Sequence, residues 1–160
     1  MRVMITGGVK SGKSSYALRL AERFHDERFF LATAEAFDDE MREKIKMHQQ
    51  ERGNTFITIE EPVYIDRVVK ENLILDCITL WMNNIMMRDL EDRWQQILGR
   101  FLSTMGNNTI IVTNETGLGN IPPNELTRRY NRMIGLANRL VADAVDEVYL
   151  MVAGIPVKIK

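Results

Sequence analysis

Residues 2–15 read RVMITGGVKSGKSS, and this stretch decides the fold of the chain. It begins with an apolar run at residues 3–5, which has the length of a buried strand, and it ends where a helical pattern begins. Between the two, the segment from Gly7 to Ser14 fits G-x-x-x-x-G-K-[ST], the pattern of a P-loop. A strand, a glycine-rich loop and a helix in this order predict a binding site for a nucleoside triphosphate.

Each part of this loop has a predicted role. Glycines let the backbone curl around phosphates, so that its N–H groups and the helix N-terminus face the negative charge. The Lys13 ammonium is expected to reach the β- and γ-phosphates, and the Ser14 hydroxyl is expected to hold Mg²⁺. The predicted nucleotide contacts are Gly7, Gly8, Val9, Lys10, Ser11, Gly12, Lys13 and Ser14.

The composition is that of one globular domain, which we expect to span residues 1–160. Hydrophobic residues make up 45% and charged residues 27% of the chain, and the net charge is −1. A charge so close to zero argues against partners attracted by bulk electrostatics, such as nucleic acid or an anionic membrane. There is no apolar run of membrane-spanning length and no signal-peptide pattern, and the lone Cys77 suits a reducing compartment. We therefore expect a cytoplasmic protein without membrane insertion.

Strand and helix patterns alternate along the chain. Strands are expected at residues 29–34, 55–59, 73–77, 109–113 and 148–152, and the last residues, 157–160, are expected to return as an antiparallel edge strand. Helices are expected at 38–52, from Pro62 to about 69, at 78–87, at 90–105 and at 124–144. This alternation predicts an α/β fold, with a mostly parallel sheet covered by helices on both faces. Ligands then gather at the carboxyl ends of the strands.

Two of the expected strands end in side chains that suit such a site. Asp76 closes the strand LILDC, where P-loop enzymes place a second carboxylate for Mg²⁺. Asn114 and Glu115 follow the strand TIIVT, and they do not match the guanine-reading Asn-Lys-x-Asp of switch GTPases. Cys77 fits a small buried residue better than a nucleophile.

The helical pattern around His48 predicts that this side chain faces inward. In a helix over 38–52, the spacing of Met41, Ile45 and His48 places them on one face, which turns the imidazole toward the protein, with Arg52 one turn further along. The pattern alone leaves open a hydrogen-bonded core histidine and a catalytic one. A neutral imidazole can attack phosphorus and carry a nucleotidyl group.

Five stretches give the chain a family resemblance, and they occur in the expected order. They are ITGGVKSGKS, FLATAEAFDDEM with KIKMHQQER, LILDCITLWMNN, VTNETGLGNIPPNELTRRYNRMIGLANRL and VDEVYLMVAGIPVKIK. The sequence resembles the bifunctional adenosylcobinamide kinase / adenosylcobinamide-phosphate guanylyltransferases of cobalamin biosynthesis nearly from end to end. The resemblance implies a RecA-like P-loop fold and association into homotrimers.

The resemblance also implies two reactions. ATP or GTP phosphorylates adenosylcobinamide, and GTP then gives GMP to an enzyme histidine, which passes it to the cobinamide phosphate. His48 matches that histidine. The implied nucleotide contacts outside the P-loop are Ala32, Thr33, Ala34, Gln49, Gln50, Glu51, Arg52, Glu60 and Asp76. The region after Asn83 is shorter than in some members, and Met47 and Gln49 stand where others carry basic residues or histidine.

Two other functions stay open on the sequence. The first is a P-loop small-molecule kinase with no covalent intermediate, in which His48 is structural. The second is a nucleotide-dependent switch or ATPase module that acts on a protein partner. If the chain is instead a kinase and guanylyltransferase, Arg128 and Arg129 are candidates to bind the substrate phosphate.

Overall fold

The computed structural model describes residues 1–36, 39–53, 55–119 and 121–160, and its centre is one seven-stranded sheet. The strands are β1 (Arg2–Gly7), β2 (Phe29–Ala32), β3 (Ile57–Glu60), β4 (Leu73–Asp76), β5 (Thr109–Val112), β6 (Glu147–Val152) and β7 (Ile155–Lys158). Their order across the sheet is β3-β2-β4-β5-β1-β6-β7. All neighbouring pairs are parallel except β6 and β7, which are antiparallel. The predicted antiparallel edge strand is therefore confirmed.

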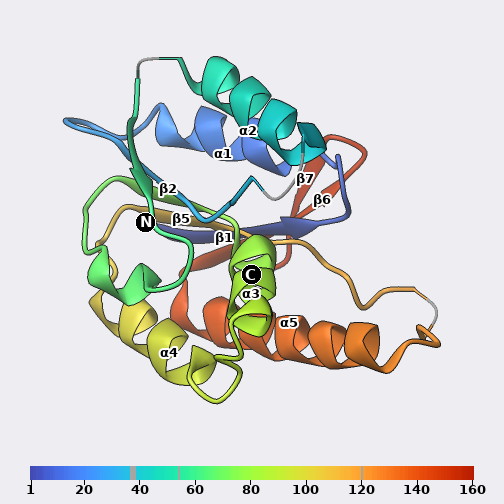
Figure 1. Cartoon of the computed structure of the whole chain (residues 1–160). Coiled ribbons are helices and arrows are strands. Elements are labelled where there is room, and N and C mark those ends of the chain that lie inside the picture. Colours follow the sequence, from blue (N-terminus) through green and yellow to red (C-terminus); the bar gives the residue numbers. More distant parts are fainter. Residues whose placement is uncertain (37–38, 54, 120) are drawn as a thin grey trace.

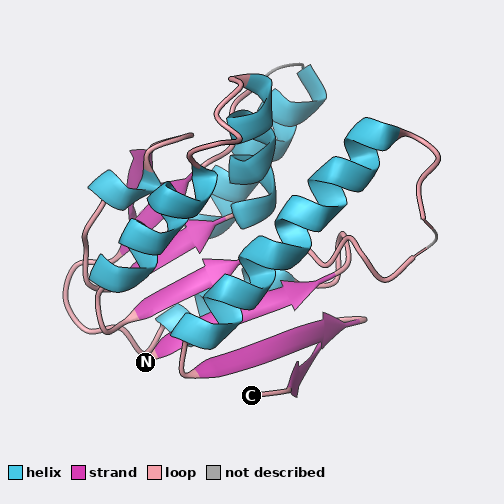
Figure 2. Ribbon diagram, turned by 90° about the horizontal axis from the view of Figure 1, so that it is seen from below, coloured by secondary structure: helices cyan, strands magenta, loops and turns pink. Residues whose placement is uncertain are grey.

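Helices cover both faces of this sheet (Figure 1). On one face lie α1 (Lys13–Ala21) and α2 (Asp39–Arg52); on the other lie α3 (Ile78–Met87), α4 (Trp94–Thr104) and α5 (Glu125–Ala144). Figure 2 shows the long α5 running beside the strands, with the segment from β5 reaching far out before it turns back into the helix. The predicted α/β fold class is confirmed.

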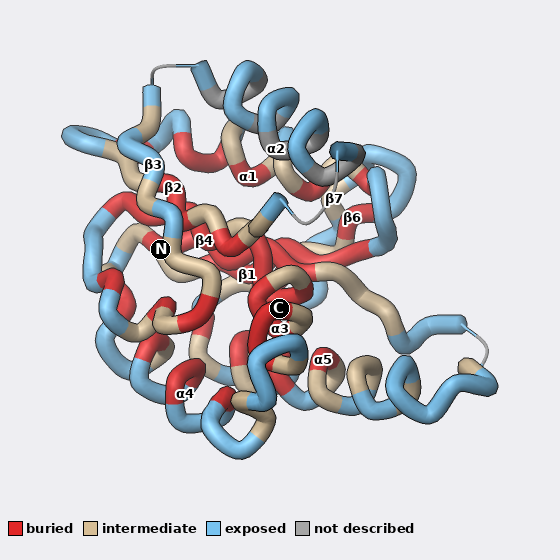
Figure 3. The backbone as a smooth tube through the Cα atoms, viewed as in Figure 1, coloured by how far each residue is buried: buried red, intermediate tan, exposed pale blue. Residues whose placement is uncertain are grey.

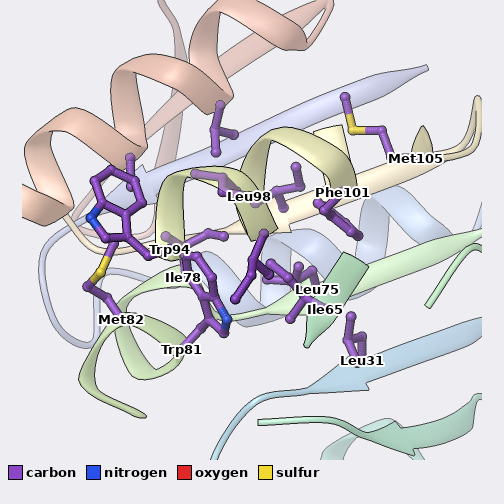
Figure 4. Close-up of a cluster of buried hydrophobic side chains, with 14 of the residues drawn as sticks. Leu31, Ile65, Leu75, Ile78, Trp81, Met82, Trp94, Leu98, Phe101 and Met105 are labelled. Atoms are coloured by element: carbon purple, nitrogen blue, oxygen red, sulfur yellow. The ribbon is translucent and has the colours of Figure 1, made fainter. Parts of the chain in front are cut away.

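The alternation of side chains along the strands builds a separate apolar core on each face. In β1, Ile5 packs on the α1 side, whereas Met4 packs on the side of α3, α4 and α5. The larger core lies on the second face and includes Trp81, Leu98 and Phe101 (Figure 4). Because both faces are buried, the central strands are apolar at nearly every position, as expected for a parallel sheet.

The predicted helix after Pro62 is wrong. Only a single 3₁₀ turn forms there, at Ile65–Arg67, and Val68 is already extended. The Glu61 carboxylate accepts hydrogen bonds from the N–H groups of Val63 (2.9 Å) and of the residue after it, which fixes a tight turn at the start of the segment. Ile65 nevertheless reaches the large core beside Leu75 (Figure 4), so a turn buries the apolar side chains that were expected on a helix.

Several element boundaries also differ from the predictions. The fourth helix begins at Trp94 and not at residue 90, and the turn before β7 lies at Ala153 and Gly154, so that β7 starts two residues earlier than expected. Helix α2 ends at Arg52, as predicted, whereas residue 38, the predicted start of this helix, lies outside the described residues. Within the described ranges, no helix combines the length and the apolar character needed to cross a membrane.

Candidate functional site

The register of the sheet aligns the predicted acidic residues in one row. Glu60 of β3 is level with Ala32 of β2, which is level with Asp76 of β4. The row continues through Val112 of β5 to Ile5 of β1, two residues before the P-loop. The parallel strands thus bring residues far apart in the sequence to the same carboxyl edge, where a ligand site is expected.

The P-loop begins at a glycine that no other residue can easily replace. Gly7 has a φ of 144°, and a Cβ atom there would lie 2.6 Å from the Met151 carbonyl oxygen and 2.9 Å from Ser11 Oγ. Gly12 then caps α1 with a left-handed φ of 93°. Gly7 therefore allows the loop to pack closely against β6. Gly12 provides the turn that directs the N-terminus of α1 toward the carboxyl edge of the sheet.

The Lys13 ammonium lies against the inside of this loop. The side chain is only 8% exposed, and Nζ donates a hydrogen bond to the Gly8 carbonyl oxygen at 2.5 Å. Ser11 Oγ lies 3.5 Å from the same ammonium. The Gly8 carbonyl oxygen and the Ser11 hydroxyl hold this buried ammonium in place. A phosphate that binds beside it gains a charge-assisted hydrogen bond, and pairing the two charges offsets the cost of removing them from water.

The turn between β6 and β7 supports the loop from below. Gly154 N–H donates to the Ser11 carbonyl oxygen at 3.1 Å, and a Cβ at Gly12 would lie 3.3 Å from Gly154 Cα. Sequence reasoning missed this contact. The glycine in the ending GIPVK was the available signal, but nothing in the pattern says that it packs against the P-loop.

Thr33 connects the ends of β2 and β4 through a buried network. The side chain is fully buried, and Oγ1 both accepts from the Cys77 N–H (2.9 Å) and donates to the Cys77 carbonyl oxygen (2.9 Å). Asn84, 1% exposed, donates to the Thr33 carbonyl oxygen at 2.7 Å and to that of Pro62 at 3.0 Å. The Thr33 hydroxyl thus supports the site from inside, while Ala32 and Ala34 on either side are half-buried.

Asp76 and Ser14 suit Mg²⁺ by their chemistry. Both present hard oxygen donors, and both are partly exposed at the carboxyl edge, on β4 and on the first turn of α1. Among the described residues, no group of three or more His, Cys, Asp or Glu side chains forms a metal cage. Mg²⁺ in nucleotide sites typically binds to one or two protein carboxylates and completes its shell with phosphates and water.

Cys77, next to Asp76, is held in its thiol form. Burial, and secondarily the Asp76 charge, raise the pKa of Cys77 from an ordinary value of 9.0 to about 11. Its Sγ accepts a hydrogen bond from the Leu80 N–H at 3.4 Å, at the start of α3. The prediction that Cys77 is a buried residue is confirmed, and its role here is to cap a helix.

Helix α2 carries His48 and lies on the outer side of α1 (Figure 1 and Figure 3). All of its side chains that the structure describes are exposed, among them Met47 (60%), Gln49 and Gln50. The side chains of Met41, Ile45 and His48, for which an inward face is predicted, lie outside the part of the chain that the structure describes, as do those of Glu51 and Arg52. Glu60, at the end of β3, is also exposed.

The segment after β5 is fixed at the P-loop by a second buried network. Thr113 Oγ1 donates to Asn138 Oδ1 at 2.8 Å, and Asn138 Nδ2 donates to the Asn114 carbonyl oxygen at 3.1 Å. The Asn114 N–H donates to Thr79 Oγ1 at 2.8 Å, and the Glu115 N–H donates to the Gly7 carbonyl oxygen at 3.1 Å. This segment therefore leaves the sheet in contact with the P-loop.

The two arginines proposed for a substrate phosphate already have partners. Arg128 Nη1 donates to the carbonyl oxygens of Pro122 (2.9 Å) and Pro123 (2.6 Å), at the start of α5. Arg129 pairs with Glu91 at 3.2 Å and lines a hollow of about 390 Å³. These contacts hold α5 to its surroundings.

Nearly the whole chain matches one family of known proteins. Residues 3–159 match the family described as "Cobinamide kinase / cobinamide phosphate guanyltransferase". The bifunctional adenosylcobalamin biosynthesis protein CobP of Pseudomonas aeruginosa is 36% identical over 100% of this chain and 98% of its own length. The CobU proteins of Escherichia coli and Salmonella typhimurium, named in the same way, are each 31% identical over the full length of both chains.

The alignment with a solved structure of an ATPase domain covers 93% of this chain and 68% of that chain, with 14% sequence identity and a TM-score of 0.40. The sequence matches are the informative ones, since they extend from β1 to β7 and include the P-loop, the end of β4 and the segment after β5. The chain belongs to the cobinamide kinase / cobinamide phosphate guanyltransferase family.

Proposed function

We propose that this chain phosphorylates adenosylcobinamide with a nucleoside triphosphate and then transfers GMP from GTP to the product through His48. As a member of its family, the chain is a transferase of cobalamin biosynthesis. One observation carries the proposal: the P-loop of β1 and α1 lies at the same sheet edge as the Asp76 carboxylate, in a chain of this family.

In the kinase step, the P-loop positions the triphosphate. Lys13 and the backbone N–H groups of Gly7 to Ser14 hold the phosphates and stabilise the charge that develops on them. The acceptor hydroxyl oxygen attacks the γ-phosphorus, the bond from that phosphorus to the bridging oxygen breaks, and a nucleoside diphosphate leaves. Bound Mg²⁺ would neutralise part of the phosphate charge, and Ser14 and Asp76 are the residues that would hold it.

In the guanylyl step, His48 is the proposed nucleophile. Its neutral imidazole attacks the α-phosphorus of GTP, pyrophosphate leaves, and a phosphate oxygen of the cobinamide phosphate then displaces the imidazole to give adenosylcobinamide-GDP. Gln49, Gln50, Glu51, Arg52 and Glu60 are proposed to bind the nucleotide in this step, together with Ala32, Thr33 and Ala34. Protonation removes the attacking lone pair, so we expect the step to slow as the pH falls through the range in which histidines titrate.

The proposal also includes the cellular compartment and the oligomeric state of the protein. The enzyme works in the cytoplasm, and it assembles as a homotrimer. Exposed apolar side chains on the β6–β7 edge support an association of copies, since Val152, Ile155 and Val157 are each at least 45% exposed. Light scattering in solution would measure the mass of the assembly.

A product assay tests the whole proposal. The protein is incubated with Mg²⁺, adenosylcobinamide and either ATP or GTP, GTP is then added, and the corrinoids are separated by chromatography. We expect the phosphate first, and then the GDP derivative with release of pyrophosphate. Phosphorylation without guanylyl transfer would indicate a simple small-molecule kinase. Nucleotide hydrolysis that a protein stimulates, without corrinoid turnover, would indicate a switch or ATPase module.

A further inference from the structure

Glu115 lies at the carboxyl edge of the sheet, next to the start of the P-loop. Strand β5 lies between β4 and β1, so the chain that leaves β5 emerges between Asp76 and the P-loop. Val112, the last residue of β5, is level with both Asp76 and Ile5. Glu115 follows three residues later, and its N–H donates to the Gly7 carbonyl oxygen at 3.1 Å. Its backbone is therefore attached directly to the start of the phosphate-binding loop.

The Glu115 carboxylate keeps most of its acceptor capacity. Oε1 accepts a hydrogen bond from the Gly117 N–H at 3.3 Å, and among the described residues no lysine, arginine or histidine forms an ion pair with it. An ionised carboxylate has about four lone-pair sites, so a further proton donor can be received. The side chain is half-buried, between the buried end of β5 and the exposed loop that follows.

Buried polar contacts hold this position in place. Asn138 of α5 binds both the Thr113 hydroxyl and the Asn114 carbonyl oxygen, and Thr79 of α3 accepts from the Asn114 N–H. The Tyr130 hydroxyl donates to the Thr79 carbonyl oxygen at 2.8 Å, which adds a second contact between α3 and α5. A side chain on such a fixed segment can keep the short, directional geometry that proton transfer needs.

The loop beyond Glu115 presents an apolar surface to solvent. Leu118 is 81% exposed and Ile121 is 85% exposed, and Leu126 at the start of α5 is 56% exposed. Such side chains can pack against the apolar faces of a large acceptor. The charges of the P-loop thus lie on one side of Glu115 and this apolar loop on the other.

We propose that Glu115 is a catalytic residue of the kinase step, whose carboxylate accepts the proton of the acceptor hydroxyl. This inference rests on the proposed function. As the hydroxyl oxygen bonds to the γ-phosphorus, its proton moves to a Glu115 oxygen, and the electrons of the broken phosphorus–oxygen bond leave with the nucleoside diphosphate. Asp76 is assigned to the metal, so Glu115 is the carboxylate attached to the P-loop that can act as the base.

The test uses Glu115→Gln, which keeps the shape and the Gly117 contact but removes the base. We expect kcat for phosphorylation of saturating adenosylcobinamide to fall by about 10²–10⁴-fold, the usual worth of general base catalysis. Nucleotide affinity, measured by titration, and GMP transfer to the enzyme should stay unchanged, because neither needs this proton. Glu22→Gln, at an exposed position at the far end of α1, is the matched control.

Rescue by the conservative variant separates catalysis from a structural role. Glu115→Asp keeps a carboxylate at a poorer distance and should recover part of the kcat that Glu115→Gln loses. Unchanged phosphorylation in Glu115→Gln would overturn the assignment, as would a loss of kcat that only follows a loss of thermal stability or nucleotide affinity. A wild type that never phosphorylates the corrinoid would overturn the proposed function itself.

Discussion

The P-loop edge and helix α2 are built in opposite ways, although both are assigned to one enzyme. The P-loop is packed against β6, supported by the β6–β7 turn and attached to the segment after β5, and Lys13 is 8% exposed. On α2, every side chain that the structure describes is exposed. The phosphoryl-transfer groups are thus part of the folded core, whereas the proposed guanylyl nucleophile is carried by a peripheral helix.

This difference has a physical consequence for mutations. A change at the P-loop edge alters packing and buried hydrogen bonds, so chemistry and stability are affected together. A change on an exposed helix surface normally shifts the free energy of unfolding by less than about 0.5 kcal/mol. Activity losses at the two regions should therefore differ in whether the fold is also weakened.

Lys13→Ala should have a larger effect than changes at Thr33 or Cys77. Removing one preorganised charge from a phosphate site costs about 10²–10³-fold in kcat, by analogy with the loss of one oxyanion-hole donor. Steady-state phosphorylation of adenosylcobinamide measures this. Lys70→Ala is the control, because its ammonium lies 4.8 Å from the centre of the Phe29 ring at the opposite, amino end of β4. A loss smaller than about tenfold in Lys13→Ala would argue against the P-loop as the kinase site.

Thr33→Val should weaken the fold at the carboxyl edge. The valine leaves the buried Cys77 N–H without its acceptor, which costs about 1–3 kcal/mol in the free energy of unfolding. Urea titration measures it, and nucleotide affinity should fall with it, because the end of β4 carries Asp76. Thr58→Val, on the exposed part of β3, should change the stability by less than about 0.5 kcal/mol. Equal stabilities of the two variants would show that the network does not hold this edge.

The smallest expected effect is a pH dependence from Cys77. Its pKa is raised to about 11 in the folded protein, so above pH 9.0 the unfolded chain loses the thiol proton first and unfolding becomes easier. The stability contribution is complete below about pH 9 and declines as the pH approaches about 11. Urea titrations at both ends of this window should show a smaller decline in Cys77→Ser, which keeps a capping atom. Tyr130 and Tyr149 also have raised pKa values, but both are present in the wild type and in Cys77→Ser, so their contribution to the decline is the same in the two proteins.

The sequence predicted the features that depend on local pattern. The strand–glycine–helix order around Gly7, the apolar strands and the helix at 78–87 all follow from periodicity and residue type, and the structure has them. The prediction of a helix after Pro62 was wrong because the apolar residues of this segment are buried by contact with α3 and α4. A turn can bury them as well as a helix can.

The long-range contacts that hold the P-loop in place could not be predicted, for a related reason. The contact of Gly154 with the P-loop, and the attachment of Glu115 to Gly7, join segments that are far apart in the sequence. They follow from the strand order, in which β1 lies between β5 and β6. A single sequence gives the types of the elements but not this order, so residues next to each other across the sheet edge look unrelated.

The most direct test of the account is the mass of the protein after incubation with Mg²⁺ and GTP. We predict a gain of one guanylyl group, labile in acid and stable in alkali, on the peptide that contains His48. The adduct should be absent in His48→Asn, which still phosphorylates adenosylcobinamide, and should form normally when the chain's other histidine, the exposed His25, is changed to Asn. No adduct on the wild type, or an adduct that persists in His48→Asn, would contradict the assignment of the two chemistries to two regions of this fold.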